Sequence, residues 1–305
     1  MKILLKSIGC RLNEAELQST ACDFNKLGHS ITNSIDDANI VIINSCAVTA
    51  EAERKSRKLI RKIYRDNPLI KVVVTGCYAT LKPEEIAEKI GADLVIDNKN
   101  KDKIAAIVSE KLDIAAVSAH AAEANESTLF KRGMDRAFVK IQDGCRYSCA
   151  YCIVTVARGE ERSRTTTEII NEINNLHNNG INEVVLTGVH IGGYGSDTNS
   201  NLPILITEIL KNSNIPRIRL SSLEPWDLTP ELLNLFKDKR MMPHLHLPIQ
   251  SGSDTVLKRM RRRTDSTTFI KSLAMARNEI PDLEVSTDII AGFPGETDTE
   301  WQQTL

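Results

Sequence analysis

The chain has 305 residues, of which 41% are hydrophobic and 26% are charged, and its formal net charge is −1. These values are typical of a globular protein with two domains and argue against a disordered chain. A near-neutral charge gives no support for a nucleic-acid partner, which would need local basic patches. No run of 18 apolar residues is present and the first residues turn polar by Lys6, so we expect a cytoplasmic protein without a membrane span.

Residues 3–112 alternate short apolar runs with longer amphipathic ones. Strands are predicted at residues 3–8, 39–43, 71–75 and 93–96, and helices at 13–27, 49–65, 83–90 and 99–112. Alternation of helices with hydrophobic strands predicts an open parallel sheet covered on both faces, a doubly wound α/β domain.

The alternation breaks between residues 113 and 136, where small and polar residues dominate. We therefore divide the chain into an N-terminal domain (1–115), a linker (116–134) and a second domain (135–305). In the second domain, strands are predicted at 137–142, 183–187, 217–221, 244–248 and 284–291, and helices at 166–178, 202–211, 230–236 and 266–278. Five strand–helix steps predict a partial or full (β/α) barrel, with a doubly wound sheet as the alternative.

Three cysteines, Cys145, Cys149 and Cys152, follow the first predicted strand of the second domain with the spacing C-x3-C-x2-C. Three thiolates can hold three irons of a cubane cluster and leave the fourth iron open for a cofactor or substrate. The alternative is a structural zinc site, but such sites are closed by four ligands and no fourth Cys or His lies nearby in the sequence. We therefore favour an iron–sulfur cluster.

Three further cysteines, Cys10, Cys46 and Cys77, each follow a predicted strand of the N-terminal domain. Because the carboxyl ends of parallel strands lie at one edge of a sheet, we expect these cysteines to come together there. The alternative is three independently buried cysteines. The seventh, Cys22, lies inside the first predicted helix and is interpreted as a packing residue. An odd number of cysteines without an export signal disfavours a disulfide framework.

The C-x3-C-x2-C spacing, with the aromatic Tyr151 before the last cysteine, resembles the signature of the radical S-adenosylmethionine (SAM) superfamily. The resemblance implies that Cys145, Cys149 and Cys152 ligate a [4Fe-4S] cluster whose open iron binds SAM. One electron then cleaves SAM and releases a 5′-deoxyadenosyl radical. The same resemblance implies that Tyr151 lies beside the adenine.

Together with the N-terminal cysteines, the chain resembles the methylthiotransferases of that superfamily along almost its whole length. The shared segments are residues 9–13, 44–49, 75–78, 186–190, 221–225, 246–253 and 292–296. The resemblance implies a second [4Fe-4S] cluster on Cys10, Cys46 and Cys77 that carries the sulfur, and two SAM molecules, one as methyl donor and one as radical source. Radical abstraction replaces proton transfer, so no side chain is assigned as a general acid or base.

Four residues at or just past predicted strand ends are expected to neighbour SAM: Gly188, Glu224, Gln250 and Gly292. The alternative for each is a turn or a helix cap. One departure from the family pattern follows the third cysteine, where relatives usually carry Ile-Pro and this chain has Val154-Thr155.

Residues 188–195 and 257–263 most resemble the branch that methylthiolates C2 of N6-threonylcarbamoyladenosine beside the tRNA anticodon. One alternative is methylthiolation of isopentenyl-adenosine in tRNA or of a ribosomal-protein aspartate. An alternative from another functional class is a non-catalytic RNA-binding protein whose cysteines bind structural zinc. The resemblance implies tRNA as the substrate, a flavodoxin- or ferredoxin-like electron donor and a monomeric enzyme.

Two basic runs, residues 54–65 and 258–263, are candidates for contact with RNA phosphates, and we favour the second. The alternative is a solvated helix face. The sequence ends at Leu305 inside a predicted helix, without the sixth barrel strand and the C-terminal RNA-binding domain that the family carries. We therefore expect a C-terminally incomplete radical SAM domain that binds tRNA weakly.

Overall fold

The computed structural model describes residues 1–114 and 135–305, so the predicted linker, 116–134, lies outside the described residues. Contacts divide the chain into two compact units. Of the described residues, unit 1 comprises 1–114 together with Val156–Arg158, and unit 2 comprises Asp135–Thr155 and Gly159–Leu305. Within the described ranges, every helix is too short or too polar to cross a membrane.

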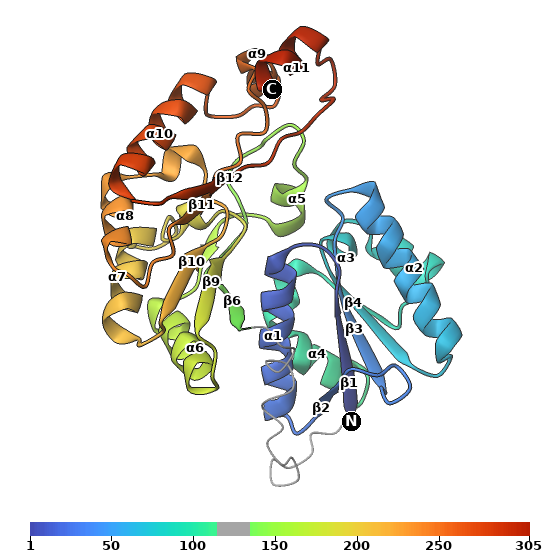
Figure 1. Cartoon of the computed structure of the whole chain (residues 1–305). Helices are drawn as coiled ribbons and strands as arrows, with labels where there is room; N and C mark the ends of the chain where they lie inside the picture. The colour runs from blue at the N-terminus through green and yellow to red at the C-terminus, as the bar shows by residue number, and fades with distance from the viewer. Residues whose placement is uncertain (115–134) are drawn as a thin grey trace. The chain divides into compact units, whose positions relative to one another are not determined.

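Unit 1 is built on a five-stranded parallel sheet with the order β2-β1-β3-β4-β5 (Figure 1). The strands are β1 (Lys2–Ser7), β2 (Ser30–Thr32), β3 (Ile40–Ser45), β4 (Lys71–Gly76) and β5 (Leu94–Ile96). Four of them match predicted strands, whereas β2 is too short and too exposed to give a sequence pattern. The winding direction changes between β1 and β3, and open α/β sheets bind ligands at such a point.

Helices cover both faces of this sheet, which confirms the doubly wound prediction. On one face lie α1 (Arg11–Lys26) and α4 (Ile104–Lys111), which bury Phe24 and Val108 against the strands. On the other face lie α2 (Ala50–Asp66), α3 (Cys77–Leu81) and the π-helical turn η1 (Glu85–Lys89). Helix α2 turns only a narrow apolar side, including Ile60 and Ile63, towards the sheet.

The predicted helix at 99–112 divides into a 3-10 helix, η2 (Asn98–Lys103), and α4. The Asp97 carboxylate accepts a hydrogen bond from the Asn100 amide (3.0 Å), and this cap winds the chain tightly before α4 begins.

Gly76 provides a test of the turn between β4 and α3. Its φ is +97° and its ψ is −168°, a region that essentially only glycine occupies, and a Cβ there would lie 2.3 Å from the Ser45 carbonyl oxygen. Gly76→Ala should therefore lower the free energy of unfolding by about 2–4 kcal/mol, because backbone strain and a backbone clash add.

The control for Gly76 is Gly91→Ala, since Gly91 also has positive φ (+81°) but a Cβ added there would have nothing within 4 Å. That change should cost about 1–2 kcal/mol. Urea unfolding of both variants measures the difference, and equal losses would contradict the steric argument.

Unit 2 contains five parallel strands whose spatial order follows the sequence. The strands are β6 (Arg136–Lys140), β9 (Glu183–Thr187), β10 (Arg217–Leu220), β11 (His244–His246) and β12 (Glu284–Ser286). The pairs β6–β9, β9–β10 and β11–β12 are hydrogen-bonded, and a parallel bridge between Ser222 and His246 continues the order from β10 to β11.

Helices follow these strands along the chain. They are α6 (Thr166–Asn178), α7 (Leu202–Asn212), α8 (Pro230–Asn234), α10 (Ser266–Glu279) and α11 (Asp298–Thr304). Smaller elements of the second half of the chain are β7 (Gln142–Asp143), β8 (Arg162–Ser163), η4 (Ile191–Gly193), η5 (Pro225–Asp227), η6 (Leu235–Lys237), α9 (Asp254–Arg259) and α5 (Val154–Arg158), of which residues 156–158 belong to unit 1. A strand order without reversal supports the partial (β/α) barrel over the doubly wound alternative.

Candidate metal centres

The three N-terminal cysteines follow three adjacent strands of the unit 1 sheet. Cys10 precedes α1 just after β1, Cys46 directly follows β3, and Cys77 directly follows β4. Burial raises the pKa of the Cys46 thiol, and the nearby thiols of Cys77 and Cys10 raise it further. A Cβ on Gly9 would lie 2.5 Å from Cys46 Cβ, so only glycine lets the Cys10 loop approach Cys46 this closely.

Each of these sulfurs has a polar neighbour. The Val48 amide lies 3.5 Å from Cys46 Sγ, and Asn98 Nδ2 lies 3.8 Å from Cys77 Sγ. The Cys10 thiol points at Asn13 Oδ1 (3.6 Å). Amide donors directed at sulfur favour the thiolate form, which is the form that binds metal.

A buried ionic cluster lies next to these cysteines in unit 1. Arg158 Nη1 donates to Glu16 Oε1 (2.8 Å) and Arg158 Nη2 donates to Asn13 Oδ1 (3.0 Å). Lys101 also pairs with Glu16, and the side chains of Arg158, Glu16 and Lys101 are 2%, 4% and 2% exposed.

Two asparagines connect this cluster to the cysteines. Asn13 contacts both Cys10 and Arg158, while Asn98 contacts Cys77 and donates to the Ala157 carbonyl (2.7 Å). Residues 157–158 thus support two of the three cysteine positions. The sequence reasoning missed Arg158, and the one available signal was a charged residue, Glu16, on the apolar side of α1.

The second cysteine set lies in the loop between β7 and α5, with all three cysteines half-buried. The Cys152 amide donates to the Cys149 carbonyl (3.0 Å), and the Tyr147 amide points at Cys145 Sγ (3.4 Å). Burial raises the pKa of the Cys145 thiol to about 11, and Glu161, Cys152 and Cys149 add to the effect. The three thiols are therefore close enough to interact electrostatically.

Both cysteine sets fit a cubane cluster. Among residues 1–114 and 135–305, no three His, Cys, Asp or Glu side chains converge as they do around a single metal ion. A cubane does not require that convergence, because each thiolate binds a different iron. The donor set at each site is three thiols, and N–H groups are directed at the sulfurs of Cys46, Cys77 and Cys145, which suits iron–sulfur ligation.

The Val154-Thr155 departure has a structural counterpart. These residues begin α5, and Thr155 Oγ1 donates to the Tyr147 carbonyl (2.6 Å) inside the cysteine loop. A proline at that position could not make this bond, so the chain fixes the loop through a hydroxyl.

The residues predicted to neighbour SAM lie in different surroundings. Tyr151 is half-buried, and burial raises the pKa of its phenol; Arg262 and Cys149 are its charged or ionisable neighbours. Glu224 receives two hydrogen bonds from the Arg262 guanidinium (3.1 and 2.5 Å) and caps η5. The Arg262–Glu224 pair and Cys149 are therefore near enough to Tyr151 to affect its phenol electrostatically.

The three remaining positions are backbone turns. Gly188 follows β9, and a Cβ there would lie 2.9 Å from the Gln142 carbonyl oxygen. Gln250 and Gly292 have φ angles of +76° and +72°. The geometry of these turns thus partly explains why glycine stands at positions 188 and 292. Cys22 lies half-buried within α1.

The preference for phosphate contact by residues 258–263 is wrong for Arg262, whose side chain is 1% exposed and paired with Glu224. Arg259 also pairs with Glu300 (2.9 Å), and the Arg263 guanidinium lies over the Tyr147 ring (5.0 Å). Charge alone did not reveal that Arg262 turns inward, whereas Lys258, Arg259, Arg261 and Arg263 are exposed.

A buried histidine in unit 2 belongs to one of the shared sequence segments, where it has no predicted role. His190 Nδ1 lies 2.8 Å from Glu161 Oε1 and its Nε2 lies 2.9 Å from Asp227 Oδ2. Its ring packs edge-on against Tyr147 (4.9 Å between centroids), which belongs to the cysteine loop. Burial lowers the pKa of His190, but hydrogen bonds and charges of Asp227 and Glu161 outweigh burial and leave it raised.

The raised pKa of His190 predicts a pH-dependent stability. The charged His190 ring stabilises the folded protein fully when the pH is below about 6.5, the pKa of histidine in the unfolded chain. This contribution is lost as the pH rises through the higher pKa that His190 has in the folded protein. His190→Gln should therefore lower the free energy of unfolding more at pH 6 than at pH 9, by on the order of 1 kcal/mol. Urea unfolding at both values measures it. His177→Gln is the control, because His177 contacts a carbonyl instead of carboxylates; a pH-independent loss for His190→Gln would contradict the prediction.

Comparisons with known proteins bear on both units. Residues 2–97 match the family described as Uncharacterized protein family UPF0004, and residues 139–305 match the Radical SAM superfamily. The chain is 36% identical to Threonylcarbamoyladenosine tRNA methylthiotransferase MtaB from Bacillus subtilis, over 99% of this chain and 69% of that protein. It is 33% identical to tRNA-2-methylthio-N(6)-dimethylallyladenosine synthase from Thermodesulfovibrio yellowstonii, over 99% of this chain and 72% of that protein.

Among solved structures, the chain is similar to the radical S-adenosylmethionine methyltransferase TsrM from Kitasatospora setae, with a TM-score of 0.68 and 16% identity. The match covers 98% of this chain and 71% of TsrM. At this identity the similarity shows the fold alone.

Proposed function

Because this chain belongs to the radical SAM methylthiotransferase family, we propose that it methylthiolates C2 of N6-threonylcarbamoyladenosine beside the anticodon of tRNA. The supporting observation is the 36% identity, over 99% of this chain, to a relative named for that substrate. The family implies a [4Fe-4S] cluster and SAM as cofactors.

In this proposal residues 1–115 carry the second cluster on Cys10, Cys46 and Cys77, and residues 135–305 carry the SAM-binding cluster on Cys145, Cys149 and Cys152. When bound, the clusters and SAM supply the sulfur and the radical C–H activation. A flavodoxin- or ferredoxin-like protein would deliver the electron.

The side chains around each site have holding and orienting tasks in this proposal. Arg262 keeps Glu224 in place beside Tyr151, so that the three form one wall near Cys149. The Tyr147 amide supports the Cys145 sulfur, and the Thr155 hydroxyl fixes the same loop from the other side. Gly188, Gln250 and Gly292 remain proposed SAM neighbours through their backbone.

Nucleoside mass analysis tests the substrate. Deleting the gene should remove the methylthio group from threonylcarbamoyl-adenosine in total tRNA and leave isopentenyl-adenosine derivatives unchanged. Restoring the gene should restore the modification, while a copy with Cys149→Ala should not. Loss of only the isopentenyl derivative would assign the chain to the second candidate.

That second candidate is methylthiolation of isopentenyl-adenosine, and the 33% identity to a dimethylallyladenosine synthase supports it. The identities to the two relatives, 36% and 33%, differ little, so the nucleoside analysis of tRNA is what distinguishes the two substrates.

A further inference from the structure

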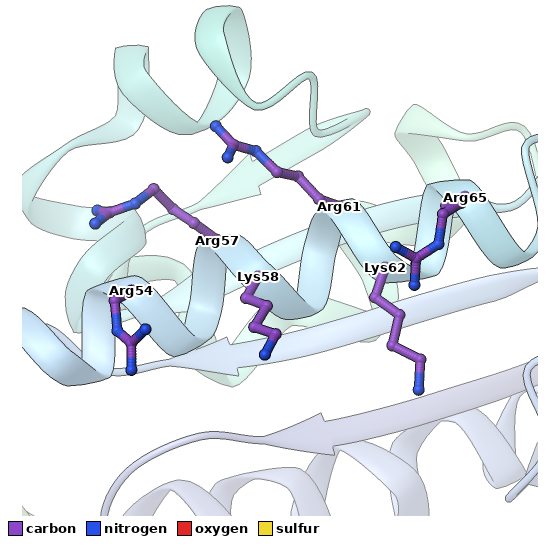
Figure 2. A pocket seen from close by; sticks show the side chains of 6 residues that line it. All are labelled: Arg54, Arg57, Lys58, Arg61, Lys62 and Arg65. Atoms are coloured by element: carbon purple, nitrogen blue, oxygen red, sulfur yellow. The ribbon is translucent and has the colours of Figure 1, made fainter.

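A groove along helix α2 is lined only by cationic side chains. It has a volume of about 330 Å³, and its lining residues are Arg54, Arg57, Lys58, Arg61, Lys62 and Arg65 (Figure 2). Figure 2 shows Lys58 and Lys62 projecting from one side of the helix, and Arg57 and Arg61 from the other.

The centre of the groove carries positive charge that no ion pair balances. Among the described residues, no carboxylate forms an ion pair with Lys58, Arg61 or Lys62, and all three are exposed. At the ends of the groove, Arg54 pairs with Glu51 (2.7 Å) and Arg65 with the adjacent Asp66 (3.6 Å). The unbalanced part of the run therefore covers the middle of the groove.

The packing and amino-terminal cap of α2 do not involve Lys58, Arg61 or Lys62. Helix α2 packs through Ile60 and Ile63, and its amino end is capped by Thr49, which accepts a bond from the Ala52 amide (3.1 Å). The cations stand at i, i+4 spacings such as 58 and 62, and like charges at this spacing destabilise a helix. A bound polyanion would remove that repulsion.

We propose that this groove binds the phosphate backbone of an RNA strand; the inference rests on the proposed function, in which tRNA is the substrate. Residues 54–65 span about 16 Å at 1.5 Å per residue, which is the length of several consecutive phosphates. Arg and Lys are the side chains that neutralise nucleic-acid phosphates.

An acidic protein surface is the other possible source of anions. Protein interfaces, however, have apolar and aromatic residues at their centre, and the lining of this groove contains none. Phosphate contacts need only positioned cations, so the lining favours RNA.

The test measures binding of unmodified tRNA to the full chain by fluorescence anisotropy at several salt concentrations. The variant replaces Lys58, Arg61 and Lys62 by Gln, which removes three charges and keeps helix propensity. The affinity should fall at least about tenfold, and the slope of log K against log salt should lose about two, since each single-strand phosphate contact contributes about 0.7.

The matched control replaces Lys26, Lys103 and Lys111 by Gln, three exposed lysines on the side of α1 and α4. It removes the same charge and should leave affinity and slope within about twofold of the wild type. Both variants should keep the wild-type iron content, and the α2 variant should melt no lower than the wild type, because the replaced charges repel one another.

Three outcomes would overturn the inference. Equal losses in the two variants would show a general effect of net charge. Unchanged tRNA affinity in the α2 variant, with methylthiolated tRNA still formed, would reject the groove but keep the proposed function. Loss of binding to inorganic polyphosphate without loss of tRNA binding would show an anion site that RNA does not use.

Discussion

Anaerobically reconstituted protein in which Cys145, Cys149 and Cys152 are replaced by Ala should retain about half of the wild-type iron and lose all cleavage of SAM. In the proposed assignment each site offers three thiols, so replacing them removes every protein ligand of one cluster only. The same proposal assigns the open iron that SAM cleavage requires to this set, so no residual activity is expected from the other set. Iron and acid-labile sulfide analysis measures the first effect, and chromatography of 5′-deoxyadenosine the second.

The reciprocal variant replaces Cys10, Cys46 and Cys77. It should also lose about half of the iron but keep cleavage of SAM, and it should form no methylthiolated nucleoside. Cys22→Ala is the control, because Cys22 lies inside α1 away from the strand ends. Loss of both clusters from either triple variant would reject two independent sites, and iron loss from Cys22→Ala would show that this residue was misassigned.

The second large effect is expected at Glu16. Replacing it by Leu leaves the buried cations Arg158 and Lys101 without its carboxylate, and breaking a buried ion pair costs about 3–5 kcal/mol. Hydrogen exchange of β3 peptides in the full chain should report that loss, because β3 lies at the centre of the unit 1 sheet.

The matched control is Glu14→Leu on the same helix, where the carboxylate pairs with Arg11 at the surface (3.4 Å). A surface pair contributes at most about 1 kcal/mol, so β3 exchange should change little. If Glu16→Leu and Glu14→Leu behaved alike, the buried cluster would not stabilise unit 1. Iron analysis adds a second readout, since Glu16→Leu should lower the iron held by Cys10, Cys46 and Cys77 and spare the other site.

The positions of the cysteines could be predicted because their signal is local. Cys145, Cys149 and Cys152 lie close together in the sequence, and the N-terminal set is marked by the strand that precedes each cysteine. Long amphipathic helices such as α6, predicted at 166–178 and observed at Thr166–Asn178, were predicted for the same reason.

Short elements and long-range contacts could not be predicted. The sequence of α5, Val-Thr-Val-Ala-Arg, is rich in β-branched residues that favour strands, and its helical form depends on contacts such as the Thr155 bond to Tyr147. The partners Arg158 and Glu16 lie 142 positions apart, so no local pattern links them.

The burial of the Arg262 side chain could not be predicted from the sequence for a related reason. Arg261 has a φ of +57°, and this left-handed residue redirects the chain directly after α9. A run of arginines shows where charge is present, but the backbone angle at one residue decides which guanidinium reaches solvent.

The assignment of Val156–Arg158 to unit 1 has a consequence for how this protein can be divided or recombined. A fragment that ends at residue 134 would contain Glu16 and Asn98. It would lack their hydrogen-bonding partners, Arg158 and Ala157. The N-terminal half is therefore not a self-sufficient module, and a chimera that joins it to the second half of a homologue inherits a foreign tripeptide beside the asparagines that contact Cys10 and Cys77. Exchanges at positions 16 and 158 should accordingly be tolerated only together, because Glu16 and Arg158 pair through their side chains, whereas Asn98 bonds to a main-chain carbonyl that any residue at 157 supplies.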